Sequence, residues 1–318
     1  MKKLLAVLTT LSLMFGMASC ASVSKNDKIQ IVTTIFPIYD WVRNIVGDNI
    51  GDIELTLLMN SGTDLHSFQP TAQDIVKISN CDMFIYVGGE SDEWVDDCLK
   101  DAVNKEMVTV NLMEGINDRL VEEDEFELEE ETAENGEDEE IELDEHIWLS
   151  LRNASACCDL IEQGIAKIDN TNKAAYETNL NAYKAKLDEL DQQYTEVVNN
   201  AEKDTVLFAD RFPFRYMVED YGLNYFAAFS GCSAESEASF ETVIFLAGKV
   251  DELGLTAVFK IESSDDSIPE SVIDVTDTKD QTIIMLDSMQ SVTSADIDAG
   301  VTYVNIMENN LAALKAGL

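Results

Sequence analysis

The sequence is short of histidine: its 318 residues include only two, His66 and His146. It also contains no GxSxG or HExxH motif and no glycine loop of the phosphate-binding kind. Neither histidine has a plausible nucleophile beside it in the sequence. We therefore do not expect the protein to be an enzyme.

Positive charge is also scarce, with 21 Lys and Arg against 62 Asp and Glu, which gives a net charge of −41. Such a balance disfavours nucleic acid and anionic lipid surfaces as partners and attracts cations, although acidic surfaces also serve solubility. A single acidic run, 122–145, holds sixteen of the carboxylates and ends directly before His146.

The six cysteines include no CxxC or other zinc-cluster spacing. One of them, Cys20, belongs to the N-terminal segment described next. The other five are Cys81, Cys98, Cys157, Cys158 and Cys232. Because an odd number cannot pair completely, we expect most of them to be small buried apolar residues.

The N-terminal segment carries two lysines followed by an apolar run, Leu4–Ala18, which is too short to span a bilayer. This pattern predicts an export signal at residues 1–19. The run ends in Met-Ala-Ser-Cys, which resembles the bacterial lipobox, so Cys20 is the predicted lipidation site and 20–27 a tether. A simple secretory signal with an incidental cysteine is the alternative. We expect an extracytoplasmic protein that a lipid anchors to the outer face of the cell membrane.

The rest of the chain alternates predicted strands and helices, as in parallel sheets. The predicted strands are 29–36, 53–59, 82–88, 107–112, 205–209, 223–229, 256–261 and 282–287. Residues 238–254 predict a helix that ends at Gly254. The fold class is therefore α/β, with an N-terminal lobe at 28–172 and a C-terminal lobe at 203–318. Two such lobes would bind a ligand in the cleft where strand ends face each other.

The segment 173–202 differs from both lobes. Its apolar residues recur at alternating steps of four and three from Tyr176 to Val197, without Gly or Pro between them. This pattern predicts one amphipathic helix of about 40 Å. A coiled coil is the alternative, but the flanking charges do not form its usual pattern. We interpret the segment as a linking helix, a spine between the lobes.

The two histidines are candidate metal ligands. His66 follows a predicted strand and precedes a helix whose start is marked by Thr71 and Asp74, so it lies where α/β proteins bind ligands. Each histidine alone could be an ordinary loop residue, but imidazole is a common ligand of transition metals. Zinc usually takes at least three protein ligands. The further candidates are carboxylates near strand ends of the second lobe: Asp210, Asp287, Glu235 and Glu262.

Four stretches match, in order, the motifs of one known family. "VTTIFPIYDWVRNIVGD" resembles its opening strand and helix, and "GTDLHSFQPTAQDI" resembles G-x-D-P-H-x-F-E-P-T, which supplies a metal-binding histidine, here His66. "DEHIWLS" resembles the D-x-H-x-W-L-S segment of a second histidine, here His146, and "IIMLDS" a late strand ending in a ligand aspartate, here Asp287. Residues 28–318 thus resemble the solute-binding lipoproteins of zinc and manganese ABC importers, of the high-affinity zinc uptake type.

This chain departs from the family pattern at the third histidine. In "ADRFPFRYMVEDYGL" that position holds Arg211, which cannot ligate a metal because its guanidinium stays protonated. The sequence leaves open whether Asp210, Cys232 or Glu235 supplies a third ligand, or whether Arg211 pairs with Asp287.

The resemblance implies a non-catalytic, monomeric binding protein that takes up a divalent transition metal in the cleft and delivers it to an ABC permease. Zinc is the expected metal, and manganese is the alternative because carboxylate sites suit it. The acidic loop is interpreted either as a collector of metal ions or as a solvated spacer. Two alternative functions belong to other classes of protein: a surface adhesin built on the same scaffold, and a metal-dependent hydrolase.

Overall fold

Two four-stranded parallel sheets, one in each lobe, form the framework of the computed structural model, which describes residues 28–123, 142–231 and 237–318. The N-terminal sheet has the order β2-β1-β3-β4, with β1 (Ile29–Thr33), β2 (Ile53–Leu57), β3 (Met83–Tyr86) and β4 (Val108–Asn111). The C-terminal sheet has the order β6-β5-β7-β8, with β5 (Thr205–Phe212), β6 (Asn224–Ser230), β7 (Ala257–Ile261) and β8 (Thr282–Leu286). All eight predicted strands are confirmed, and so is the α/β class.

The N-terminal lobe surrounds its sheet with helices. They are α2 (Phe36–Val46), α3 (Ala72–Asn80), α4 (Trp94–Lys100), α5 (Leu112–Gly115) and α6 (Leu151–Ile168), with short 3-10 turns η1 (Gly47–Asp52), η2 (Leu65–Ser67), η3 (Glu90–Asp92), η4 (Asn117–Arg119) and η5 (Ile147–Leu149). The predicted capping box at the start of α3 is present, because Thr71 and Asp74 exchange hydrogen bonds. β1 ends earlier than predicted, since Phe36 and Pro37 already form the first turn of α2.

The C-terminal lobe contains α8 (Arg215–Tyr221), α9 (Phe240–Leu253), α10 (Ser267–Val275), α11 (Ser294–Asp298) and α12 (Tyr303–Gly317). Gly254 ends α9 in the left-handed conformation, at φ 60°, as predicted. β5 extends three residues beyond its predicted end, and its pairing with β6 shifts register between Phe208 and Arg211. The irregularity therefore falls beside the two charged residues at the end of β5.

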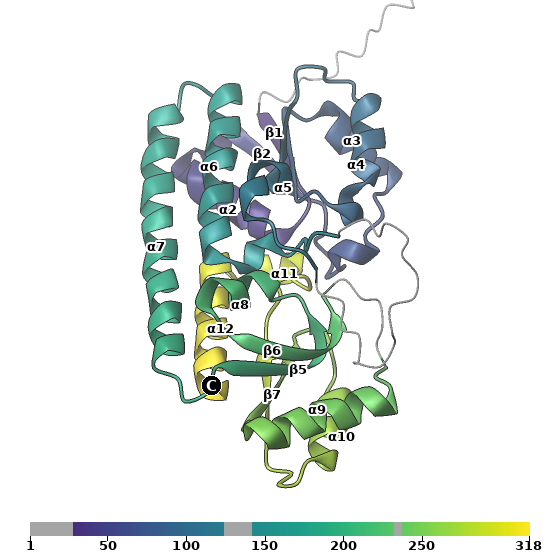
Figure 1. Ribbon diagram of the computed structural model, residues 1–318. Coiled ribbons are helices and arrows are strands. Elements are labelled where there is room, and N and C mark those ends of the chain that lie inside the picture. Colours follow the sequence, from purple (N-terminus) through teal and green to yellow (C-terminus); the bar gives the residue numbers. More distant parts are fainter. Residues whose placement is uncertain (1–27, 124–141, 232–236) are drawn as a thin grey trace, which may run out of the picture.

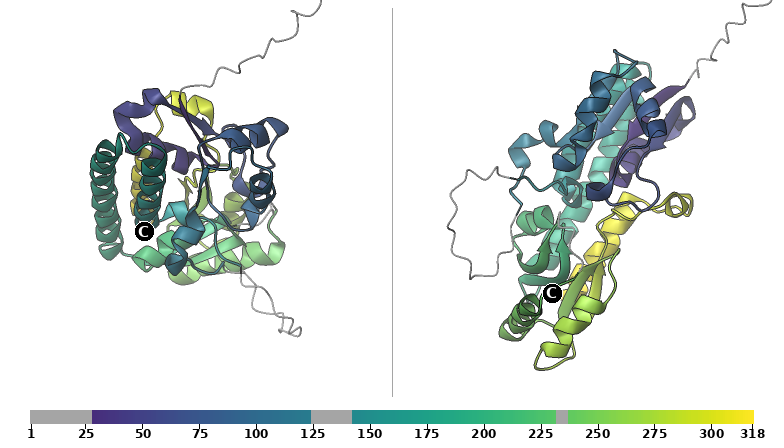
Figure 2. Two further views of the ribbon diagram at one scale, coloured as in Figure 1. Left: turned by 90° about the horizontal axis from the view of Figure 1, so that it is seen from above. Right: turned by 90° about the vertical axis from the view of Figure 1, so that its right-hand side faces the viewer.

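The linking helix, α7 (Lys173–Asn199), runs along one side of both lobes (Figure 1). The predicted stripe from Tyr176 to Tyr194 is buried. Asn179, early in α7, donates a hydrogen bond to the carbonyl of Ile45 in α2, at 3.0 Å. Tyr194, near its end, donates to the carbonyl of Met307 in α12, at 2.7 Å. One helix is thus fastened to both lobes, and Figure 2 shows the elongated molecule that results.

The core is continuous between the lobes: one apolar cluster includes Phe84 of β3 and Phe208 of β5. A smaller cluster lies beneath α9 and α10. Tyr303 of α12 reaches the N-terminal lobe: its ring packs edge-on against Trp41 of α2, and its hydroxyl donates to the carbonyl of Trp148, at 2.7 Å. The C-terminal helix therefore helps to close the core of the N-terminal lobe.

Of the cysteines that the structure describes, Cys81, Cys157 and Cys158 are buried free thiols, as expected, and Cys98 is half-buried. The predicted signal, the tether with Cys20 and most of the acidic loop lie outside the described residues. Within the ranges that are described, no helix combines the length and apolar character needed to cross a membrane. The residue boundaries of the lobes stay predictions.

Candidate metal centre

The two histidines, eighty positions apart in the sequence, meet in the structure. His66 lies in η2, after β2, and its backbone N–H donates to the Asp64 carboxylate, at 3.0 Å. His146 directly precedes η5 and is fully buried. The two Nε2 atoms are 3.1 Å apart, and the ring planes are inclined by 59°.

The carboxylate of Asp144 fixes the ring of His146 at Nδ1. The Nδ1 atom of His146 lies 3.1 Å from Asp144 Oδ1, which also accepts a hydrogen bond from the backbone N–H of His146, at 2.8 Å. The hydroxyl of Tyr216 donates to the carbonyl of Asp144, at 2.7 Å. Burial alone would lower the pKa of His146, but the charge and hydrogen bond of Asp144, together with the charges of Glu145 and Glu123, outweigh it, and the pKa is raised.

The side chains of Ser91 and Glu145 contact His66 at Nδ1. Its Nδ1 is 2.8 Å from the hydroxyl of Ser91 and 3.4 Å from Glu145 Oε2. The other oxygen of Glu145 accepts the backbone N–H of Ser91, at 2.8 Å. Burial would raise the pKa of Glu145, but its contacts with His66 and Ser91 hold it below the usual value.

This arrangement is suited to a metal ion. Both Nδ1 atoms are occupied by polar partners, and both Nε2 atoms point toward each other. Two nitrogens on one tetrahedral zinc ion lie about 3.3 Å apart, because each Zn–N bond is about 2.0–2.1 Å long. The observed separation of 3.1 Å is close to this value, so small movements would admit a zinc ion between the rings.

An acidic hollow of about 340 Å³ opens in front of Glu145 and His66. Its lining comprises His66, Glu90, Ser91, Glu123, Glu142, Leu143 and Glu145. The pKa of Glu90 is raised, first by the charge of Glu142. The two described ends of the acidic loop are paired here, since Glu123 N–H donates to the carbonyl of Glu142, at 3.0 Å. The predicted acidic loop therefore begins and ends at the hollow beside His66.

Asp287, a predicted ligand, lines a different cavity, of about 430 Å³, together with Glu262. Its Oδ1 accepts the backbone N–H of Met289, at 2.7 Å. Burial, and then the charge of Glu262, raise the pKa of Asp287 to about 7. Asp287 does not line the hollow beside His66, and its part in metal binding stays a prediction.

The remaining candidates for a third ligand divide into two groups. Asp210 is buried, and its carboxylate accepts hydrogen bonds from the backbone N–H of Arg211 and Ile261 and from the hydroxyl of Ser264, at 2.8–3.0 Å. These contacts join the ends of β5 and β7. Cys232 and Glu235 lie outside the described residues.

Arg211, at the position of the missing histidine, turns toward the first lobe. Its guanidinium donates to Asp64 Oδ2, at 3.1 Å, while the other oxygen of Asp64 accepts from His66. The partner of Arg211 is thus Asp64, whereas pairing with Asp287 was one of the possibilities that the sequence left open. Among the residues described here, no group of three or more His, Cys, Asp or Glu is arranged to hold a metal ion.

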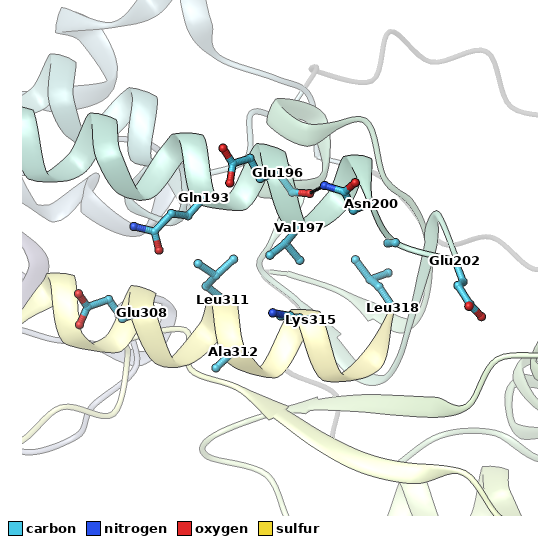
Figure 3. Close-up of a pocket in the computed structure, with 11 residues that line it drawn as sticks. Gln193, Glu196, Val197, Asn200, Glu202, Glu308, Leu311, Ala312, Lys315 and Leu318 are labelled. Atoms are coloured by element: carbon cyan, nitrogen blue, oxygen red, sulfur yellow. Dashed lines mark hydrogen bonds between the residues drawn. The ribbon is translucent and has the colours of Figure 1, made fainter.

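Another cavity, of about 780 Å³, lies between the C-terminal parts of α7 and α12 (Figure 3). Val197, Leu311 and Leu318 form its apolar wall, and Lys315 places an ammonium group in it. No histidine lines this cavity. Its chemistry therefore does not favour a transition metal.

Sequence reasoning missed three residues that act on the histidines: Ser91, Asp144 and Glu145. Asp144 could have been found, because a carboxylate two residues before a histidine can accept its backbone N–H. No local signal predicts that Ser91, 25 positions after His66, reaches its ring.

Comparison with known proteins gives consistent results. The high-affinity zinc uptake system protein ZnuA of Bacillus subtilis is 31% identical over 295 residues, which cover 93% of this chain and 89% of that protein. The zinc-binding protein AdcA of Streptococcus pyogenes is 26% identical over 322 residues, and the match covers 99% of this chain but only 61% of AdcA. The chain thus spans about three fifths of the length of these streptococcal relatives.

Solved structures show the same fold. The lipoprotein YcdH of Bacillus subtilis superimposes with a TM-score of 0.74 at 27% identity, covering 92% of this chain and 99% of that one. The Zn(II)-bound ZnuA-like domain of Streptococcus pneumoniae AdcA gives 0.70 at 26% identity, covering 91% and 98%. The model of the family described as zinc-uptake complex component A, periplasmic, matches residues 31–317. These matches confirm the resemblance drawn from the motifs: the chain belongs to the ZnuA family of zinc-uptake components.

Proposed function

We propose that this protein binds a divalent transition metal ion, zinc first of all, outside the cytoplasm and delivers it to an ABC permease. The observation that carries the proposal is the approach of the two Nε2 atoms of His66 and His146 to 3.1 Å, with both Nδ1 atoms occupied. Membership of a zinc-uptake family supports it, as do the names of the relatives from Bacillus and Streptococcus.

The ligand set of the proposed site is His66, His146 and, from the second lobe, Asp287. Asp287 would have to approach the histidines across the junction of the lobes, where Ser288, its neighbour, already accepts a hydrogen bond from the indole of Trp148, at 2.9 Å. This contact supports a site between the lobes. Manganese remains the alternative metal, because the third histidine is replaced by Arg211.

The protein is proposed to act by binding and release, without catalysis. A metal-dependent hydrolase would need a general base beside the open face of the metal ion. Glu145 lies instead behind His66, at Nδ1, on the side away from His146. The lipid anchor at Cys20, the monomeric state and the collecting role of the acidic loop complete the proposal.

Thermal unfolding with zinc, with manganese and with a chelator tests the proposal. A ligand present at a thousand times its Kd stabilises a protein by about 4 kcal/mol. For a chain of this size, each kcal/mol raises Tm by about 2–4 °C, so zinc should raise it by about 10 °C. The double variant His66→Ala, His146→Ala should show no such rise while retaining its circular dichroism spectrum. No response of the parent to either metal would refute the metal site.

A further inference from the structure

The carboxylate of Glu145 is buried directly behind the imidazole of His66. Its side chain is 4% exposed, and Oε2 lies 3.4 Å from His66 Nδ1. Within the described residues, this oxygen has no hydrogen-bond partner. A carboxylate buried in this way is costly unless a nearby positive or donor group compensates it. The donors at hand are an N–H on His66 Nδ1 and the hydroxyl of Ser91.

The surrounding chain is shaped around this carboxylate. The backbone N–H of Ser91 donates to Glu145 Oε1 and fixes its orientation, at 2.8 Å. Gly89 leaves room for it, because a Cβ at that position would stand 2.2 Å from Oε1. Gly89 also has φ 80°, which favours glycine. Glu145 is therefore held in one place against His66.

The two histidines differ in how their proton is placed. The carboxylate of Asp144 accepts only, so a neutral His146 carries its proton on Nδ1 and leaves Nε2 bare. A neutral His66 could carry its proton on either Nδ1 or Nε2, because the hydroxyl of Ser91 beside Nδ1 can either donate or accept a hydrogen bond. With the proton on Nε2, His66 would donate to His146 across the 3.1 Å gap and block the metal position. With the proton on Nδ1, both Nε2 atoms are available.

We propose that Glu145 is a positioning residue that holds the proton of His66 on Nδ1 and so keeps its Nε2 open to the metal ion. The contact at Nδ1 is the observation that distinguishes Glu145 from the other carboxylates of the hollow. Such partners behind a ligand histidine fix its tautomer and orientation. The inference rests on the proposed metal-binding function of His66 and His146.

The substitution Glu145→Gln gives a sharp test, because Ser91 N–H determines how the new amide turns. The amide oxygen takes the place of Oε1 and accepts from Ser91, so the NH₂ group faces His66 Nδ1 as a donor. This reverses the preference and favours the proton on Nε2. The variant is nearly isosteric, so the fold should be retained. The matched control is Glu142→Gln, which removes the same charge from the same hollow.

Nitrogen NMR of metal-free protein labelled with ¹⁵N-histidine reads the tautomer directly, and the spectrum contains only two imidazoles. A His66→Ala variant assigns them. At alkaline pH, the parent and Glu142→Gln should show Nδ1–H on both rings. Glu145→Gln should shift His66 toward Nε2–H and leave His146 unchanged.

Zinc affinity, measured by competition with a chelator, should fall about 10- to 100-fold in Glu145→Gln and much less in Glu142→Gln. An unchanged His66 tautomer in Glu145→Gln, or an affinity equal to that of Glu142→Gln, would overturn the inference. Failure of the parent to bind zinc would instead overturn the proposed function. The NMR measurement needs no metal, so the two failures can be told apart.

Discussion

The ion pair between Arg211 and Asp64 connects β5 of the second lobe with the turn that carries His66. The two side chains are 3.1 Å apart and only 19% and 22% exposed. A double-mutant cycle of Asp64→Asn, Arg211→Gln and the combination isolates the interaction. Asparagine retains an oxygen that can cap His66, so the cycle reports the charge pair more than the turn.

The expected coupling lies near the upper end of the range for exposed ion pairs. Exposed ion pairs contribute about 0.2–1 kcal/mol, and hydrogen bonds to charged groups about 1.5–3 kcal/mol. Because this pair is about four-fifths buried, we expect about 1 kcal/mol in the free energy of unfolding, measured by urea denaturation. The single variant Asp64→Asn should also weaken zinc binding, since the turn that carries His66 loses its fastening to β5.

Lys100 and Asp97 provide the matched control. This pair is shorter, at 2.8 Å, but its side chains are 70% and 85% exposed, so its cycle should show no measurable coupling. If distance alone decided the energy, the control would be the stronger pair. A coupling between Arg211 and Asp64 no larger than that of the control would refute the reasoning that burial makes this contact matter.

Two further predictions concern residues near the histidines. A Cβ at Gly231 would lie 3.0 Å from His146 Cε1 and 2.9 Å from a backbone oxygen. The substitution Gly231→Ala should therefore lower the free energy of unfolding in urea by about 1–3 kcal/mol and weaken zinc binding. The control Gly248→Ala, where a Cβ meets nothing within 4 Å, should change neither the stability nor the zinc affinity. Burial raises the pKa of Asp92 to about 7, so the folded state holds this proton to higher pH than the unfolded state, whose carboxyl titrates near 4. Its contribution to stability therefore falls as pH rises from about 4 to 7; Asp92→Asn should flatten the stability profile in that window, and an unchanged profile would contradict the assignment.

Much of the fold follows from local patterns. The capping box of Thr71 and Asp74, the C-cap at Gly254 and the buried stripe of α7 were predicted because each depends on neighbours within one or two turns. The boundaries of β1 and β5 were less accurate. Phe36 continues the apolar run of β1 but already belongs to α2. The charged residues Asp210 and Arg211 interrupt the apolar pattern of β5, so the predicted strand ended before them although β5 continues.

The site was predicted only in part. The motifs predicted that His66 and His146 belong to one site, and the structure brings their rings together, but their part in metal binding stays a prediction. The contacts that orient them come partly from distant segments. Ser91 reaches His66 because η3 and η2 pack together, and Arg211 reaches Asp64 from the other lobe. Such contacts form only when the chain folds and brings distant segments together, so the periodicity of the sequence carries no information about them.

Because Tyr303 completes the packing of the N-terminal lobe, the core of that lobe cannot be finished before α12 has docked. Its side chain fills the space beside Trp41, and its backbone N–H donates to the buried carboxylate of Asp40, at 3.1 Å. Until α12 has been synthesised and has docked, the N-terminal lobe lacks this partner, and an apolar surface stays exposed. Contacts separated by more than 260 positions form slowly. Emerging chains should therefore depend on protection from aggregation until α12 docks.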